Sequence, residues 1–222
     1  LSLIKALEEC DNDTEAHVKR TQTMGAELGK RLGLSDMQQS NLALLCILHD
    51  IGKIGIPLEI LNKPSRLNDS EWRMMKTHTE KGYQIAVSSQ ELSHIADMIR
   101  HHHECWDGHG YPDGLTKESI PLLSRIISVV DAFDAMVNDR VYRPAMSVEA
   151  AINELKRCAG SQFDPGIVNE FIQMIHDLGM VENNSDTTTE NNENDSVDMN
   201  IVGFADKREV QTNVYEVAYC RY

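Results

Sequence analysis

The sequence predicts an all-α domain over residues 1–180. Apolar residues recur at intervals of three and four up to about residue 178, which is the period of a helix with one buried face. Residues that cap helices stand before several of these runs. Short alternations of β-branched and polar residues, which predict strands, do not occur in the same region of the sequence.

Each expected helix has its own start or stop signal. In the first half of the chain we expect four helices. The first carries Val18, Met24, Leu28 and Leu32 and ends at Gly33, and the second begins at the capping box Ser35-x-x-Gln38 and runs into His49. The third extends from about Asp69 to Val87, and the fourth carries Leu92, Ile95 and Ile99. In the second half we expect an apolar helix after Pro121 carrying Ile126, Val130 and Phe133, and two closing helices capped by Ser147 and by Asp164-Pro165.

The C-terminal part of the chain has a different composition. Residues 181–200 hold six acidic residues and no lysine or arginine among many Asn, Thr and Ser, which predicts a disordered linker or tail. Residues 201–222 show some alternation typical of a strand, and no function is assigned to them. The tail carries much of the net charge of −14, so residues 1–180 are only moderately acidic and general nucleic-acid binding is not expected.

The composition also indicates in which cellular compartment the protein is expected. No apolar run approaches the roughly 18 residues that a membrane span needs, so no membrane segment is expected. Five scattered cysteines without a C-x-x-C pair argue against a disulfide framework and a thiolate zinc site, and they favour a reducing cytoplasm. The start at Leu1, without an initiator Met or signal-peptide character, is expected for a fragment of a longer protein.

The most informative stretch is residues 100–112, which read R-H-H-H-E-C-W-D-G-H-G-Y-P. Consecutive imidazoles are costly to bury unless something binds them, and imidazole is the commonest protein ligand of divalent metals. The D-G-x-G-Y-P that ends the stretch consists of turn residues, which cannot continue a helix. The stretch therefore predicts a helix end that carries metal ligands, followed by a shaped loop.

Other candidate ligands are spread along the chain. The candidate metal ligands are His17, His49, Asp50, His78, His102, His103 and Asp131, with Asp13 one helical turn before His17. Asp131 stands in an otherwise apolar helix, where a buried carboxylate must be paired or coordinate a cation. Seven such side chains exceed the needs of one ion, whereas two metals that share Asp50 as a bridge would use all of them.

The chain has two His-Asp dipeptides, and their contexts differ. His49-Asp50 ends an apolar helix and runs into I-G-K-I-G-I-P, where the glycines let the backbone turn tightly and Lys53 lies one turn from the ligands. His176-Asp177 stands at a helix end before Leu-Gly and is expected to be a surface pair. Asp134, three residues after Asp131, is expected to orient a ligand histidine through a hydrogen bond.

Five blocks of the sequence stand in a recognisable order. They are H-D-I-G-K-I-G-I-P at 49–57, I-L-N-K-P-S-R-L at 60–67, M-K-T-H-T-E-K-G at 75–82, H-H-E-C-W-D-G-H-G-Y-P-D-G-L at 102–115 and R-I-I-S-V-V-D-A-F-D-A-M-V-N-D-R-V-Y-R at 125–143. Together they resemble the HD-GYP family of bacterial cyclic dinucleotide phosphodiesterases, a branch of the HD metal-dependent phosphohydrolases. The resemblance covers roughly residues 13–175 and implies an HD-domain helical bundle.

The resemblance implies a role for each matching residue. It assigns the seven candidate ligands named above to the metals. It implies catalytic roles for Asp50 and Lys53 and substrate contacts for Lys53, Tyr111, Arg140 and Arg143, with both arginines on the phosphates of the substrate. The loop Gly110–Pro112 is implied to border the site and to contact diguanylate cyclase (GGDEF) domains, while His101 receives no role.

The resemblance also implies a divalent metal pair and a reaction. Family members with a third metal tend to have Glu where this chain has Asp13; because aspartate is one methylene shorter, we expect two metals, with Asp13 as an additional ligand or a residue behind the ligands. Imidazoles and carboxylates suit iron or manganese and also admit nickel, cobalt or zinc. The implied activity is hydrolysis of cyclic di-GMP to linear pGpG and onward to GMP. Two alternatives stay open: a preference for cyclic GMP-AMP or pGpG, and a weakly active module that binds diguanylate cyclases.

Overall fold

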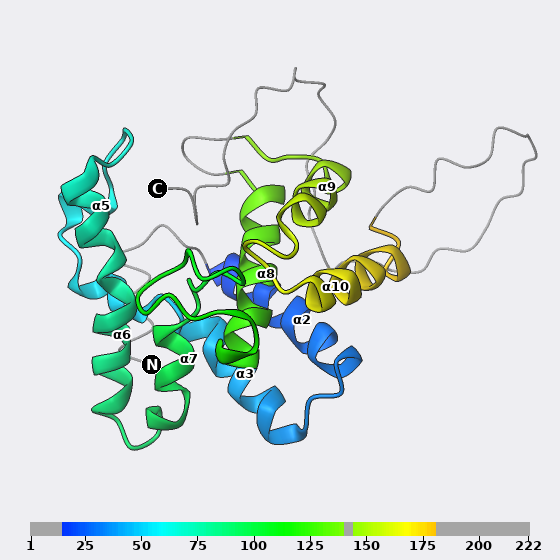
Figure 1. The fold of residues 1–222 in the computed structure, drawn as a ribbon, viewed down its shortest axis with the longest axis horizontal. Coiled ribbons are helices and arrows are strands. Elements are labelled where there is room, and N and C mark those ends of the chain that lie inside the picture. Colours follow the sequence, from blue (N-terminus) through cyan, green and yellow to red (C-terminus); the bar gives the residue numbers. More distant parts are fainter. Residues whose placement is uncertain (1–14, 140–143, 181–222) are drawn as a thin grey trace, which may run out of the picture. The chain divides into compact units, whose positions relative to one another are not determined.

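A computed structural model describes residues 15–139 and 144–180, and within these ranges all regular structure is helical (Figure 1). The α-helices are α2 (Glu15–Arg31), α3 (Asp36–Leu48), α4 (Leu58–Leu61), α5 (Asp69–Lys76), α6 (His78–Val87), α7 (Ala96–Arg100), α8 (Leu122–Val137), α9 (Val148–Cys158) and α10 (Pro165–Asp177). Three 3₁₀ turns join them: η1 (Ile51–Gly55), η2 (Ser93–Ile95) and η3 (Lys117–Ser119). The all-α prediction is confirmed, and none of the described helices is long and apolar enough to cross a membrane.

The predicted tail and the short C-terminal segment, residues 181–222, lie outside the described residues. The same holds for Asp13, Arg140 and Arg143, which belong to the candidate site. The structure therefore describes the part of the chain that holds the seven candidate metal ligands, Lys53 and Tyr111.

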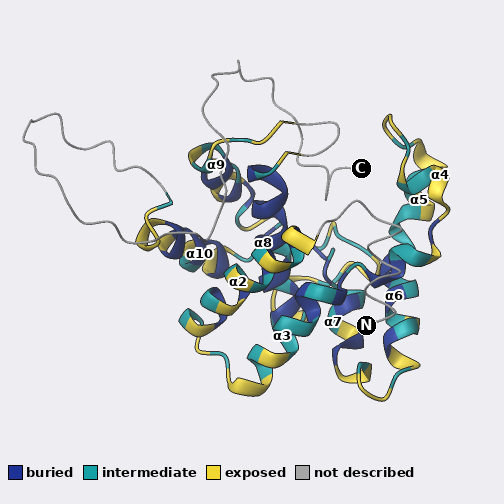
Figure 2. Ribbon diagram, turned by 180° about the vertical axis from the view of Figure 1, so that it is seen from behind, coloured by how far each residue is buried: buried dark blue, intermediate teal, exposed yellow. Residues whose placement is uncertain are grey.

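Helix α8 is the centre of the hydrophobic core. It is apolar on almost every side, and Figure 2 shows it buried along most of its length. Helices α2, α3, α9 and α10 pack against it, and Phe133 on α8 meets Phe171 on α10 edge to face with ring centroids 5.0 Å apart. A helix that is apolar all round has to be buried. For this reason the two carboxylates that α8 carries, Asp131 and Asp134, lie inside the domain.

The helix starts that were predicted from capping residues are confirmed. Ser35 and Gln38 form a reciprocal capping box at the start of α3. Ser147 caps α9, and Asp164 accepts two main-chain N–H groups at the start of α10. Each cap satisfies donors that the first turn of a helix leaves without a partner.

The helix predicted from about Asp69 to Val87 is divided in the structure. α5 ends at Lys76, α6 begins at His78, and Thr77 separates them. The hydroxyl and the N–H of Thr77 both donate to the main-chain oxygen of Met74, at 2.7 and 3.0 Å. A threonine side chain that competes for a nearby carbonyl disturbs helical hydrogen bonding. The break leaves His78 at the first position of α6, facing the candidate site.

A close contact between η1 and α6 joins two of the sequence blocks. A Cβ atom on Gly52 would overlap the main-chain oxygen of His78 and would lie 2.5 Å from the nitrogen of Gly82. Only glycine allows the backbones of η1 and α6 to approach each other this closely. The contact fixes the segment that follows His49 and Asp50 against the start of α6.

Candidate metal centre

Five segments of the described chain bring the seven predicted ligands to one place. The ligands come from α2 (His17), the two residues after α3 (His49 and Asp50), the start of α6 (His78), the turn after α7 (His102 and His103) and the middle of α8 (Asp131). Four of the histidines are at most 4% exposed. Such a concentration of buried polar side chains needs partners that can replace water.

The seven residues form two sets. In the first set the ligand atoms of Asp50, His78, His102 and His103 all lie within 4.8 Å of one another. In the second set the same limit holds for His17, His49 and Asp131. Each set contains imidazoles and a carboxylate, and each can hold one divalent transition metal.

Asp50 lies between the two sets. Its Oδ1 is 3.3 Å from Nε2 of His78 and 3.7 Å from Nε2 of His102, both in the first set. Its Oδ2 is 3.4 Å from Nε2 of His49, in the second set. Oδ1 of Asp50 thus faces the first set and Oδ2 faces the second. A carboxylate needs this arrangement to bridge two metals.

The histidines are oriented by hydrogen bonds on the side away from the centre. Nδ1 of His49, His78 and His102 lies 3.3, 2.8 and 2.6 Å from the main-chain oxygens of Leu45, Met75 and Ile99. A carbonyl oxygen can only accept, so Nδ1 carries a proton and Nε2 is the nitrogen that faces the centre. Partners of this kind hold metal-ligating histidines in proteins.

His17 is oriented by a carboxylate instead of a carbonyl. Its Nδ1 lies 2.7 Å from Oδ2 of Asp134, as the sequence predicted for Asp134. Asp134 is itself held by Arg20, whose Nε and Nη2 donate to its two oxygens at 2.5 and 2.9 Å. The sequence did not single out Arg20, because an arginine on a helix face is usually solvated and the partner lies more than 100 positions away.

Two polar atoms at the centre lack hydrogen-bond partners among the described residues. They are Nε2 of His49 and Oδ1 of Asp50, and both are buried. Leaving such atoms without partners costs about 1–3 kcal/mol each. A divalent cation in each set would satisfy both atoms, so the donor set fits the metals that the sequence predicts.

The charges at the centre influence one another. Burial alone would raise the pKa of Asp50, but Lys53 and His49 hold it well below its usual range. Burial disfavours a charge on His49, yet Asp50 raises the pKa of His49 to about 9. Burial lowers the pKa of His78 to about 4, and burial with the neighbouring His102 places the pKa of His103 well below its usual range. His78 and His103 therefore offer neutral imidazoles and Asp50 an ionised carboxylate, the forms that bind metals.

Lys53 and Tyr111 lie next to these ligands. Nζ of Lys53 is 2.9 Å from Oδ2 of Asp50 and places a fixed cation beside the carboxylate between the two sets. The ring of Tyr111 stacks on His103, with centroids 5.0 Å apart and planes 30° apart, and its peptide bond to Pro112 is cis. The structure thus brings the Gly110–Pro112 loop against the first set.

A carboxylate that the sequence did not single out holds this loop. Glu104 is buried, and its two oxygens accept the main-chain N–H groups of Asp113, Gly114 and Leu115 at 2.7, 3.1 and 3.0 Å. A Cβ atom on Gly110 would overlap the main-chain nitrogen of Cys105, so the loop also folds tightly onto its own start. The sequence offered one signal for Glu104, which is that a charged residue stands directly after the histidine run.

Two further observations bear on the sequence predictions. His101, Glu104 and Asp113 form a third group of possible ligands, but Asp113 is already paired with Arg100 at 2.9 and 3.0 Å and Glu104 with the loop. We therefore assign this group to the loop and not to a metal. Among the described cysteines Cys46 and Cys158 form no disulfide, whereas Cys105 is disulfide-bonded.

Comparison with known proteins identifies the family. Residues 3–167 match the family model of the HD domain. A cyclic di-GMP phosphodiesterase of Thermotoga maritima is 36% identical over 194 residues, covering 85% of this chain and 53% of that protein. The cyclic di-GMP phosphodiesterase response regulator RpfG of Xanthomonas campestris is 38% identical, covering 77% of this chain and 46% of that protein. A 3′3′-cGAMP-specific phosphodiesterase of Vibrio cholerae is 34% identical, covering 78% and 33%.

Solved structures agree on the fold. A cyclic GMP-AMP phosphodiesterase of V. cholerae superposes with a TM-score of 0.62 at 23% identity, over 81% of this chain and 48% of the other. An HD-GYP-type protein of Bdellovibrio bacteriovorus superposes with a TM-score of 0.58 at 21% identity, over 72% and 51%. The chain spans about half the length, or less, of the relatives it matches. By its sequence, its helical fold and its His-Asp blocks, the chain belongs to the HD domain family, in the HD-GYP branch of cyclic dinucleotide phosphodiesterases.

Proposed function

We propose that the chain is a metal-dependent phosphodiesterase that hydrolyses cyclic di-GMP to linear pGpG, and pGpG onward to GMP. The observation that carries the proposal is the position of Asp50, which presents one oxygen to each of two ligand sets. The names of the relatives support the substrate class, since they hydrolyse cyclic di-GMP or 3′3′-cGAMP.

The seven ligands would hold two divalent metals, the first between Asp50, His78, His102 and His103 and the second between Asp50, His17, His49 and Asp131. The mixed imidazole and carboxylate set suits iron or manganese best. Such a pair lowers the pKa of water and neutralises charge on phosphoryl oxygens. Asp13 lies outside the described residues, and two metals remain our proposal.

The chain's own residues then position the substrate. Lys53 holds a cation beside Asp50, where negative charge develops on the phosphoryl group during hydrolysis. Tyr111 forms the wall of the first set through its stack on His103. Arg140 and Arg143 would hold phosphate oxygens of the substrate, as the resemblance implies. A cytoplasmic location and docking of GGDEF domains at the Gly110–Pro112 loop belong to the same proposal.

The test is incubation of the purified chain with cyclic di-GMP and Mn²⁺ or Fe²⁺, with the products separated by chromatography. We expect pGpG to appear and Asp50→Ala to abolish both turnover and metal binding. The matched control is Asp177→Ala, which removes the aspartate of the second His-Asp pair; Asp177 is exposed and pairs with Arg31. Full turnover by Asp50→Ala would contradict the bridging role.

The same assay separates the alternatives. Faster cleavage of 3′3′-cGAMP or of pGpG than of cyclic di-GMP would reassign the substrate within the same chemistry, as one group of relatives suggests. Metal binding without turnover of any of the three would favour a module that only binds cyclases.

A further inference from the structure

Helix α5 presents two partly buried side chains to the loop that borders the first ligand set. Trp72 and Lys76 stand four positions apart and therefore share one face of the helix, which we call the Trp72–Lys76 face. The indole of Trp72 meets the ring of Tyr111 edge to face, with centroids 6.3 Å apart. Nζ of Lys76 lies over the same ring, 5.7 Å from its centroid. Because Tyr111 also stacks on His103, this face of α5 lies one aromatic ring away from a metal ligand.

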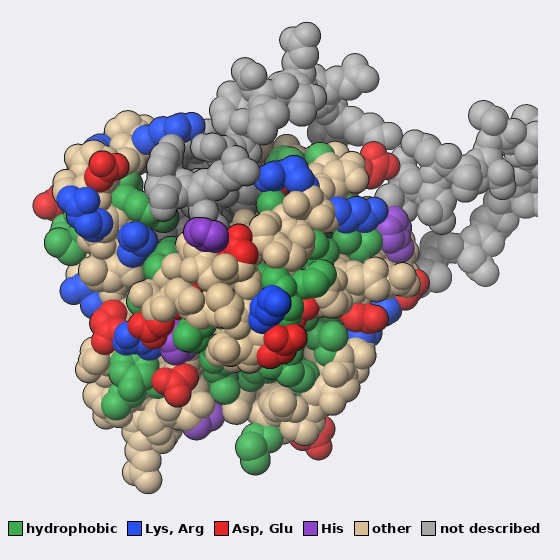
Figure 3. All heavy atoms as spheres, in the orientation of Figure 1, with side chains coloured by type: hydrophobic (Ala, Val, Ile, Leu, Met, Phe, Trp, Pro, Cys, Tyr) green, Lys and Arg blue, Asp and Glu red, His purple; other side chains and the backbone are tan. Residues whose placement is uncertain are grey.

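Both side chains keep donors that a ligand can use. Among the described residues no carboxylate pairs with Lys76, and the indole N–H of Trp72 donates to no acceptor. Lys63, which precedes α5, is different because it pairs with Glu71 at 2.5 Å. An ammonium carries three donors and an indole one, so the Trp72–Lys76 face offers donors and no acceptor. Figure 3 shows lysine and arginine side chains gathered over α5, which favours an anionic ligand there.

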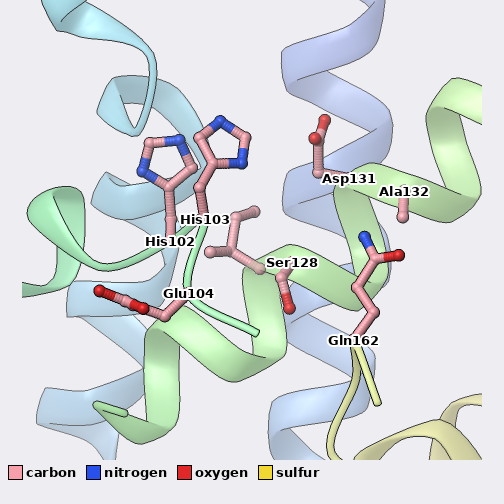
Figure 4. Close-up of a pocket in the computed structure, with 8 residues that line it drawn as sticks. His102, His103, Glu104, Ser128, Asp131, Ala132 and Gln162 are labelled. Atoms are coloured by element: carbon pink, nitrogen blue, oxygen red, sulfur yellow. The ribbon is translucent and has the colours of Figure 1, made fainter. Parts of the chain in front are cut away.

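The bases of a dinucleotide have to lie outside the pocket at the metal centre. Figure 4 shows this pocket, which His103 and Gln162 line together with other residues. Its volume is about 20 Å³, enough for a water-sized group and too little for a nucleobase. A base has to lie instead against side chains that border the ligands. From His103 to the Tyr111 ring and on to Nζ of Lys76 the steps are 5.0 and 5.7 Å, together comparable to the length of one nucleotide.

The donors and the rings of the Trp72–Lys76 face match guanine. An indole gives any base a flat surface to stack on. Lysine donates to O6 and N7 of guanine, which are both acceptors. Adenine carries an amino group in place of O6, and that donor would face the ammonium. A phosphate also binds lysine, yet it gains nothing from the aromatic rings beside Lys76, so the surroundings of the ammonium favour a base.

We propose that Trp72 and Lys76 form a guanine subsite beside the metal centre, where the base stacks on the indole and its O6 and N7 accept from the ammonium. The inference rests on the proposed phosphodiesterase function and names the base that the site selects. Lys76 is the specificity-determining residue, because it separates guanine from adenine, while Trp72 holds either purine. No bond forms or breaks at this subsite, since the phosphate lies at the metals.

The test varies the base while the phosphodiester stays the same. Rates of the purified chain are measured on cyclic di-GMP, on cyclic di-AMP and on bis(4-nitrophenyl) phosphate, a diester without a base or sugar. Lys76→Met keeps the apolar stem of the side chain and removes its donors. We expect its kcat/KM to fall about 30-fold on cyclic di-GMP and to change less than about threefold on the other two substrates. The matched control is Lys156→Met, which removes an exposed lysine on α9.

Two more variants test the direction of the selectivity. Lys76→Gln offers the acceptor and the donor that N6 and N7 of adenine need, so cyclic di-AMP should become a better substrate than cyclic di-GMP. Trp72→Leu should lower kcat/KM about tenfold on both cyclic dinucleotides and leave their ratio unchanged. Metal content and melting temperature of the Lys76 variants should equal those of the control, because Lys76 is not a metal ligand.

Several results would overturn the inference. Equal losses on both cyclic dinucleotides in Lys76→Met, without a gain in Lys76→Gln, would place the ammonium on a phosphate. A loss that extends to bis(4-nitrophenyl) phosphate would place Lys76 at the reacting phosphate, and a loss that follows metal content or melting temperature would make its role structural. A parent chain that binds neither cyclic dinucleotide would remove both the substrate and the subsite.

The proposed activity and the subsite can fail separately. If the parent cleaves cyclic di-GMP and Lys76→Met keeps the same preference for guanine over adenine, the activity stands and the subsite is wrong. If the parent binds cyclic di-GMP without cleaving it, the proposed activity is wrong. Dissociation constants from calorimetry then replace kcat/KM, and the same variants still decide whether Lys76 selects guanine.

Discussion

Replacing Glu104 should loosen the loop that carries Tyr111 while leaving the seven metal ligands in place. The Glu104 carboxylate is 4% exposed and accepts three main-chain N–H groups from Asp113, Gly114 and Leu115. Glu104→Gln keeps the shape and turns one oxygen into a donor, which then faces an N–H group. Glu104→Ala removes all three acceptors.

The magnitude follows from these bonds. A hydrogen bond to a charged group contributes about 1.5–3 kcal/mol. Water can reach the outer part of the loop, where Asp113 and Gly114 are exposed, so the three bonds do not add in full. We expect the free energy of unfolding to fall by about 3 kcal/mol for Glu104→Ala and by about half of that for Glu104→Gln. For a domain of this size, 3 kcal/mol corresponds to roughly 6–12 °C in melting temperature.

Urea unfolding and hydrogen exchange measure the effect. The amides of Asp113, Gly114 and Leu115 should lose protection, and hydrolysis should slow because Tyr111 no longer packs on His103. The matched control is Glu118→Ala, an exposed glutamate after the same loop. Unchanged protection of the three amides in Glu104→Ala would refute the reasoning, whatever happens to the melting temperature.

Three further predictions concern the centre itself. Lys53→Ala should leave metal content unchanged and slow hydrolysis about a hundredfold, measured by metal analysis and initial rates, since a fixed cation is lost where charge develops. Asp134→Asn should weaken metal binding about 10- to 100-fold in a metal titration, because His17 loses the carboxylate that orients it. Because Asp50 raises the pKa of His49 to about 9, a metal must displace a proton from His49 below that pH. Metal affinity should therefore rise about tenfold per pH unit from 6 to 8, measured by chelator competition.

The two substitutions, Lys53→Ala and Asp134→Asn, have matched controls. Lys156→Ala removes an exposed lysine on α9 and should leave the rate unchanged; equal effects of the two lysine variants would contradict a special role for Lys53. Asp177→Asn is the matched control for Asp134→Asn and should leave metal binding unchanged. A metal affinity that does not change between pH 6 and 8 would show that His49 carries no proton to displace.

Much of the site could be predicted from the sequence because its signals are local or compositional. A carboxylate such as Asp131 in an apolar helix has to be paired, and His49-Asp50 differs from His176-Asp177 in its glycine-rich context. Capping residues such as Ser35 predict helix starts for the same reason, since they satisfy neighbouring backbone groups.

The rest depends on contacts between distant segments. Arg20 reaches Asp134 across more than 100 positions, and no periodicity indicates such a pair. The break at Thr77 arises because one hydroxyl competes for a carbonyl, which apolar spacing does not reveal. Gln162 lies far along the sequence from the candidate ligand histidines, and its loop is brought near them by the hydrogen bond between its main-chain oxygen and the N–H of Trp106. Such residues act behind the ligands, and the structure is needed to find them.

The contact at Gly52 explains how the two ligand sets keep their separation. His49 belongs to the second set and is fixed to the end of α3, while His78 belongs to the first set and begins α6. Asp50 can serve both only if these helices meet at one distance, since paired metals lie about 3.5–4 Å apart. The backbone of Gly52 in η1 packs directly against His78 and Gly82 of α6, and a Cβ atom there would overlap the main-chain oxygen of His78. The glycine that the sequence marked as a turn residue thus allows the close approach that brings the two ligand sets together.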